Sequence, residues 1–261
     1  MPWSAAEFHL LLPLFMLVLS RVSGLMIASP MFSSAAMPMQ FKVFLAVAMS
    51  IAVFPFASQF PAAEVTLASA VIGLVGEFML GLLIGFGITL LFVGVQLAGQ
   101  LISQQAGIAL GAVFNPELDS SVTPVSQIYF FVSLMIFLAL GGEQALVSAL
   151  LDSFRTIPLL TFRMTEHVFE MVVDLLGLSF VWAIRVGAPT TVALLLSFLT
   201  LGFVSRSVPQ LNILTIGFPI KAAIGILVMA LSIVSLEGVL IDSLTSCMEM
   251  IRETLALPPT P

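Results

Sequence analysis

The chain has 261 residues, of which 60% are hydrophobic and only 8% are charged, and its formal net charge is −6. Soluble domains carry about 45–50% apolar and about 25% charged residues, so this chain lacks the polar side chains to cover a soluble surface. We therefore expect an all-α protein in apolar surroundings, in lipid or against partner subunits. Basic residues are scarce and form no cluster, which argues against nucleic acid as a partner.

Apolar segments separated by short polar breaks predict about six to seven long helices, some kinked or broken, in a single domain over residues 1–261. The first segment runs from about residue 8 to 28 and contains Arg21. The second runs from about 41 to 60, and its Pro55 should kink or end the helix because proline lacks the backbone donor.

The third stretch, between Glu64 and Glu117, contains Glu77 as its only charged residue. A continuous helix of that length would extend about 75 Å at ~1.5 Å per residue, more than twice a bilayer core of about 30 Å. The stretch is therefore two spans, a broken helix, or one long helix that reaches beyond the membrane. Gly81 and Gly85 form a small-xxx-small pair that predicts close packing against another helix.

Three glutamines, Gln96, Gln100 and Gln104, recur at every fourth residue of the same stretch. On a helix this spacing places their amides along one slowly rotating stripe. Amides that face lipid are costly because lipid offers no hydrogen-bond partner. We expect this polar stripe to face a neighbouring helix, another subunit or water in a passage.

The remaining chain predicts two more long segments and a final one. Residues 125–151 form one apolar segment, and residues 152–170 form either an exposed connection or a short amphipathic helix. A segment from about 168 to 203 contains Pro189 as an expected kink, and the last segment runs from about 219 to 240.

Several charged residues lie within or at the edge of apolar segments: Arg21, Glu77, Asp174, Arg185 and Lys221. Insertion of a central Arg, Lys or Asp costs about 2.5–3.5 kcal/mol, so each of these charges needs a partner or water. They either form pairs that lock helices or subunits together, or line a proton or ion pathway. The first interpretation is favoured because arginine stays protonated and cannot relay protons.

Nothing in the sequence predicts catalysis or a bound group. The two histidines, His9 and His167, are far apart, and no HExxH spacing surrounds them. The phosphate-binding GxxxxGK[ST] loop and the GxSxG nucleophile turn are both absent from the sequence. We therefore predict no catalytic residue, no metal site and no cofactor.

A series of motifs resembles the FliR family of flagellar export proteins, whose virulence counterpart in the injectisome is the SctT family. The series comprises Arg21, Gly76-Glu77, QLAGQLISQQAG at 96–107, Asn115-Pro116, Gly141-Gly142, and RSVPQLN at 206–212 leading to Gly217, Pro219 and Lys221. The resemblance extends from about residue 10 to 240. The residues around the PQxN run look more flagellar than injectisome-like.

The resemblance implies a core subunit of a protein export gate. Such a subunit assembles with FliP and FliQ, beside other export proteins such as FlhB, into a closed helical pore for unfolded flagellar polypeptides. Residues 1–200 would be FliP-like and residues 201–261 FliQ-like. The expected place is the bacterial inner membrane at the flagellar basal body, with lipid contacts and with helical hairpins largely above the membrane plane.

The resemblance also implies two sites. The first is a pore plug at Gly107, Gly111, Val113, Phe114, Asn115 and Pro116, where glycine supplies backbone freedom and proline ends the helix; without the resemblance this is an ordinary helix-to-loop turn. The second is a partner-facing turn formed by Arg206, Pro209, Gln210, Asn212, Gly217 and Pro219. This turn either caps two spans or docks against neighbouring subunits.

Two other functions remain open. A secondary transporter of a small solute would use Glu77, Asp174 and Arg185 at a mid-membrane site between broken helices. A passive scaffold would only nucleate a ring of partners. A stable complex with FliP and FliQ would exclude an independent transporter. Ion leakage after deletion of the glycine-rich loop would exclude a pure scaffold.

Overall fold

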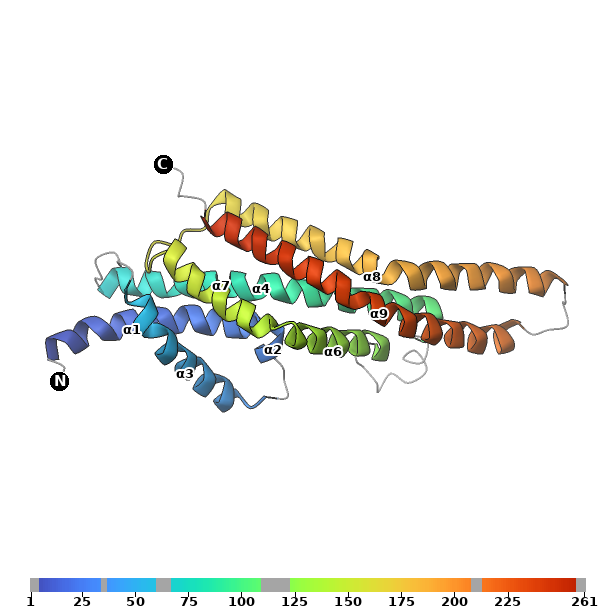
Figure 1. Cartoon of the computed structure of the whole chain (residues 1–261), viewed down its shortest axis with the longest axis horizontal. Coiled ribbons are helices and arrows are strands. Elements are labelled where there is room, and N and C mark those ends of the chain that lie inside the picture. Colours follow the sequence, from blue (N-terminus) through green and yellow to red (C-terminus); the bar gives the residue numbers. More distant parts are fainter. Residues whose placement is uncertain (1–4, 34–36, 60–66, 109–122, 208–212, 257–261) are drawn as a thin grey trace. The chain divides into compact units, whose positions relative to one another are not determined.

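The fold is described from a computed structural model, which describes residues 5–33, 37–59, 67–108, 123–207 and 213–256. All regular secondary structure in these ranges is helical, so the predicted all-α class is confirmed (Figure 1). Seven of the helices have 15 or more residues. The helices are α1 (Ala5–Ala28), α2 (Pro30–Ser33), α3 (Met39–Ala57), α4 (Leu67–Ala106), α6 (Pro124–Ala139), α7 (Gly142–Thr156), α8 (Glu166–Ser207) and α9 (Ile213–Ala256).

The long glycine-rich stretch forms one uninterrupted helix, α4, of 40 residues. At ~1.5 Å per residue its length is about 60 Å. Of the three arrangements that the sequence allowed, the structure therefore has the single long helix. The glycines do not break α4, because a helix tolerates them where a neighbouring backbone comes close.

The predicted apolar segment 125–151 forms two helices that meet at a bend, in keeping with the expectation that some helices are kinked or broken. Helix α6 begins after Thr123, whose hydroxyl accepts a hydrogen bond from the Ser126 amide at 3.3 Å. It ends at Ala139, and α7 begins at Gly142. The reason is Gly141, which has a φ of 73°, a left-handed backbone that glycine adopts without a steric penalty.

The chain divides into two compact units, each built from segments that are distant in sequence. Unit 1 comprises residues 1–90, 141–175 and 244–261, and unit 2 comprises residues 91–140 and 176–243. The predicted division into a FliP-like and a FliQ-like part concerns likeness to other proteins, and it stays a prediction.

In unit 1, α3 packs against α1 and α7 (Figure 1). Phe15 of α1 meets Phe54 of α3 edge to face, with ring centroids 5.7 Å apart. The α1 side chains Leu17, Val22 and Leu25 are fully or almost fully buried. Burial of such apolar side chains stabilises the unit by about 1.5–3 kcal/mol each.

Unit 2 has an aromatic centre. The ring of Phe92 meets Phe137 at 5.4 Å and Phe130 at 5.7 Å between centroids, both edge to face. A Cβ at Gly99 would lie 2.6 Å from the Cα of Ser126, so α4 and α6 approach each other closely at this point. A glycine without a Cβ permits this approach.

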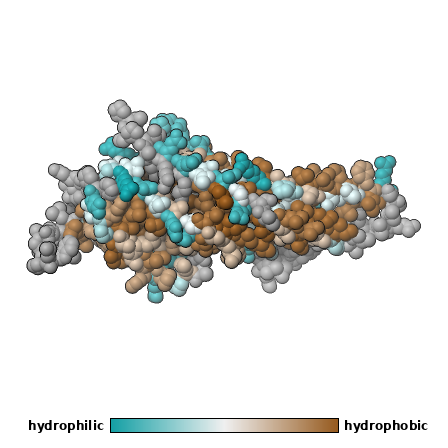
Figure 2. Space-filling model, viewed as in Figure 1, coloured by the Kyte–Doolittle hydropathy of each residue, from teal (hydrophilic) through white to brown (hydrophobic). Residues whose placement is uncertain are grey.

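Large apolar side chains remain exposed along many of the helices, and Figure 2 shows them in brown over much of one face. Phe44 of α3 is 78% exposed and Phe203 of α8 is 72% exposed. Four helices in the described residues are long and apolar enough to cross a membrane, and up to six candidate spans result if two bent helix pairs each count as one. The chain therefore has the character of a membrane-associated protein.

Candidate functional site: a buried ion pair at the junction of three helices

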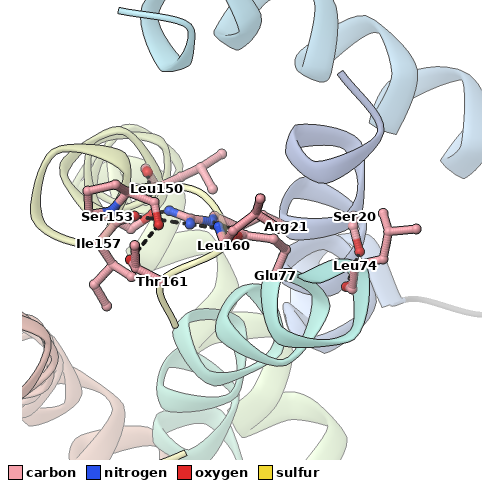
Figure 3. A network of polar contacts seen from close by, with 10 residues as sticks. Ser20, Arg21, Leu74, Glu77, Leu150, Ser153, Ile157, Leu160 and Thr161 are labelled. Carbon is pink, nitrogen blue, oxygen red and sulfur yellow. Dashed lines mark hydrogen bonds and ion pairs between the residues drawn. The ribbon is translucent and has the colours of Figure 1, made fainter. Parts of the chain in front are cut away.

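A buried polar cluster in unit 1 is built around Arg21 and Glu77 (Figure 3). Arg21 is on α1 and Glu77 is on α4, and their side chains are 0% and 1% exposed. Arg21 Nε donates to Glu77 Oε2 at 2.6 Å, and Arg21 Nη2 lies 2.5 Å from the same oxygen. The structure thus brings together two charges that the sequence placed in separate apolar segments.

The remaining donors of Arg21 reach toward α7. Nη1 donates to the hydroxyl of Ser153 at 3.1 Å, and Nη2 donates to the carbonyl of Ile157, also at 3.1 Å. The guanidinium lies 4.2 Å from the ring centroid of Phe154, a cation–π contact. One arginine therefore connects α1, α4 and α7.

The second oxygen of Glu77 is also occupied. Oε1 accepts a hydrogen bond at 2.9 Å from the backbone amide of Leu160, in the connection between α7 and α8. Leu160 has a φ of 69°, and this left-handed conformation costs a residue with a side chain about 1–2 kcal/mol. The hydrogen bond and the packing around Leu160 hold the backbone in this conformation.

Close contact between α1 and α4 positions the pair. A Cβ at Gly81 of α4 would overlap the carbonyl oxygen of Arg21, and a Cβ at Gly24 of α1 would overlap that of Phe78. At Gly85 the added atom would lie 2.6 Å from the carbonyl oxygen of Leu25. The close packing predicted for Gly81 and Gly85 is therefore confirmed, and α1 is the helix they pack against.

This geometry favours a structural lock over a proton pathway. Every nitrogen of the guanidinium donates to a neighbour, and both oxygens of Glu77 accept from Arg21 or Leu160. Protonation of Glu77 would remove the negative charge that pairs with Arg21 and so weaken the contact between α1 and α4. A buried pair of this kind is costly to break from one side because the other charge is then left without compensation.

The other predicted charged residues are not part of this cluster. Asp174 and Arg185 on α8 are exposed in the single chain, and neither belongs to an ion pair within the described ranges. Lys221 on α9 is half-buried, with its ammonium 5.1 Å from the ring centroid of Phe198. Their roles as subunit locks stay predictions.

The predicted polar stripe lies on α4 in unit 2, where Gln96 and Gln100 are half-buried and Gln104 is exposed. Of the predicted plug, Gly107 directly follows α4 and has a φ of 78°, a left-handed backbone suited to glycine. The other plug residues, Gly111, Val113, Phe114, Asn115 and Pro116, lie outside the described residues. The plug and the stripe both stay predictions.

The predicted partner-facing turn is only partly described. Arg206 is exposed near the end of α8, and both Gly217 and Pro219 lie within α9, where Gly217 is buried and Pro219 is exposed. Pro209, Gln210 and Asn212 lie outside the described residues. The docking role stays a prediction.

Sequence reasoning missed the groups that complete the Arg21–Glu77 cluster. It placed residues 152–170 in an exposed connection or short amphipathic helix, but α7 continues to Thr156 and Leu159 is 3% exposed. The backbone groups of Ile157 and Leu160 carry no sequence signal. The only available signal was indirect, namely that two buried opposite charges in apolar segments need partners.

In the described ranges, no three histidine, cysteine or acidic side chains converge in a way that could hold a metal ion. The only cysteine, Cys247, is buried on α9. The Arg21–Glu77 cluster itself pairs two charges and anchors backbone groups of Ile157 and Leu160.

Comparison with known proteins identifies the family. Residues 12–246 match the family described as bacterial export proteins, family 1. The flagellar biosynthetic protein FliR of Escherichia coli strain K12 is 29% identical over 84% of this chain and 84% of its own length. FliR of Bacillus subtilis strain 168 is 26% identical over 95% of this chain and 96% of its own length.

A virulence protein is also similar. The Yop proteins translocation protein T of Yersinia pestis is 30% identical over 69% of this chain and 69% of its own length. The resemblance to the FliR family and its virulence counterpart, drawn from the sequence motifs, is confirmed. Because the family match covers most of its length, this chain belongs to family 1 of the bacterial export proteins.

Proposed function

We propose that this chain is a non-enzymatic core subunit of the flagellar type III protein export gate, in the inner membrane at the flagellar basal body. The observation that carries the proposal is the family match over residues 12–246, together with FliR relatives that align over most of both chains. The flagellar system is favoured because the alignment with Yop translocation protein T covers a smaller share of the chain.

Assembly with FliP and FliQ into a closed helical pore is the second part of the proposal. It is supported by the apolar surface, because side chains such as Phe44, Met135 and Phe203 are more than 70% exposed in the single chain. Such a surface needs lipid or protein to cover it. The Arg21–Glu77 cluster would keep unit 1 rigid while the surrounding surface packs against partner subunits.

The function is tested by expressing this chain in an E. coli strain that lacks its own FliR, together with FliP and FliQ from the same source as this chain. We expect restored swimming and secretion of flagellar proteins into the medium, and copurification of the three subunits. The same strain with FliP and FliQ alone is the control. Recovery of this chain only as a lone monomer, with no restored secretion, would contradict the proposal.

The plug is the third part of the proposal, and it is supported by the left-handed glycine at the end of α4 and by the family resemblance. Replacing residues 109–114 with a Ser-Gly linker of equal length should leave assembly intact but open the pore. We expect cells to leak ions and to grow poorly when the variant complex is expressed. As a control, residues 257–261 are replaced by a Ser-Gly segment of five residues. If cells that express the 109–114 variant do not leak ions, the plug is refuted.

A further inference from the structure

The connection between α7 and α8 crosses the buried ion pair and is fixed there by backbone contacts. The carbonyl of Ile157 accepts from Arg21 Nη2 at 3.1 Å, and the amide of Leu160 donates to Glu77 Oε1 at 2.9 Å (Figure 3). Each charge of the pair thus holds one point of the connection. Both contacts are made by backbone atoms of the connection, so they hold it directly against the ion pair.

Two glycines of α4 form the surface on which the connection lies. A Cβ at Gly73 would overlap Cδ2 of Leu160 and would lie 3.3 Å from Cδ2 of Leu17. One turn further along α4, a Cβ at Gly76 would lie 3.7 Å from the carbonyl oxygen of Phe162, an ordinary contact distance. The space over Gly73 is therefore filled by the Leu160 side chain, whereas Gly76 leaves room for a methyl group.

The connection is held in a conformation that it would not adopt alone. Leu160 has a φ of 69°, which disfavours any residue with a side chain. Its neighbour Thr161 is exposed, as are Arg163 and Met164 shortly after it, whereas Leu159 is buried at 3% exposure. A short connection with local backbone strain, anchored by Leu159, the Leu160 side chain and two hydrogen bonds to the ion pair, opens at a lower free energy than the long helices around it.

We propose that residues 157–162 form a strap that closes over the Arg21–Glu77 pair and opens as a unit of its own while α1, α4 and α7 stay folded. In the closed state the strap supplies the last partners of both charges and keeps water away from them. In the open state water reaches the carboxylate and the guanidinium, which weakens their attraction because the local dielectric rises. The strap thereby sets how tightly α1 and α4 are locked.

The strap can be tested without any substitution by hydrogen exchange on the full chain, purified in mild detergent with whatever subunits copurify. We expect the Leu160 amide to be protected, because it is hydrogen-bonded to a buried carboxylate. Its exchange should nevertheless be about tenfold or more faster than that of the interior amides of α1, α4 and α7. Exchange of Leu160 only together with those helices would overturn the proposal.

A substitution at Gly73, which the Leu160 side chain covers, provides a second test. Gly73→Val should displace the Leu160 side chain and raise amide exchange across residues 159–162 by about tenfold, with exchange in the interior of α7 unchanged. Adding Leu160→Gly should restore protection, since it removes both the overlapping side chain and the strain while keeping the amide. Gly76→Ala is the matched control and should change nothing.

Two results of the substitution series would also overturn the proposal. If the amides of the strap exchange at the same rate in Gly73→Val, the Leu160 side chain does not pack against Gly73. A parallel rise in α1, α4, α7 and the strap would mean that the strap is not an independent unit. If Gly73→Val does not accumulate, the measurement on the unmodified chain decides alone.

Discussion

Glu77→Leu is expected to remove most of the protein from the membrane fraction. Glu77 is 1% exposed and accepts hydrogen bonds from both Arg21 and Leu160. Removing one partner of a buried ion pair typically costs 3–5 kcal/mol, roughly, because the other charge is left without compensation. Since whole domains are stable by only about 5–15 kcal/mol, a loss of this size should lower both accumulation and the melting temperature in detergent.

The double variant Arg21→Met with Glu77→Leu shows whether the unpaired Arg21 charge causes the loss of stability in Glu77→Leu. If the single substitution fails because Arg21 is left unpaired, removing both charges should restore much of the lost stability, as apolar replacements of buried pairs often do. Glu170→Leu is the matched control, because the contact of Glu170 with His167 is exposed and worth at most about 1 kcal/mol. A Glu77→Leu protein that accumulates and assembles normally but exports nothing would instead support a role in the transport pathway.

Several properties of the fold followed directly from the sequence because they depend on composition and local pattern. The apolar fraction of 60% predicted apolar surroundings, and the long apolar segments predicted the all-α fold. The pair Gly81 and Gly85 predicted a close helix contact, since that spacing repeats on one face of a helix. Local chemistry therefore predicted the elements and one packing surface.

What the sequence did not predict depends on contacts between distant residues. Arg21 and Glu77 are 56 positions apart, and their pairing requires α1 and α4 to pack in one particular register. The carbonyl of Ile157 and the amide of Leu160 complete the cluster, but every residue has such groups. The sequence predicted broken helices but not that Gly141 would be the position of a break, because a glycine in an apolar run is equally compatible with a continuous helix, as α4 demonstrates.

Gly81→Val is expected to separate α1 from α4 and to destabilise the chain about as strongly as loss of Glu77. A Cβ at Gly81 would overlap the Arg21 carbonyl oxygen and would lie 2.9 Å from the Leu25 nitrogen. These are backbone atoms of a helix, so no side-chain rotation relieves the overlap and the whole of α1 must shift. Overpacking a tight contact costs about 1–3 kcal/mol or more.

The shift of α1 also disturbs the ion pair, so Gly81→Val should cost more stability than ordinary overpacking. Arg21 belongs to the backbone that must move, so its guanidinium is drawn away from Glu77, Ser153 and Ile157. Gly81→Ala should already lower the melting temperature, and Gly81→Val should lower it further. Gly177→Val on α8 is the control, because nothing lies within 4 Å of a Cβ at that position. If the valine variants at 81 and 177 melt at the same temperature, α1 and α4 are not in backbone contact, and the ion pair cannot be positioned as described.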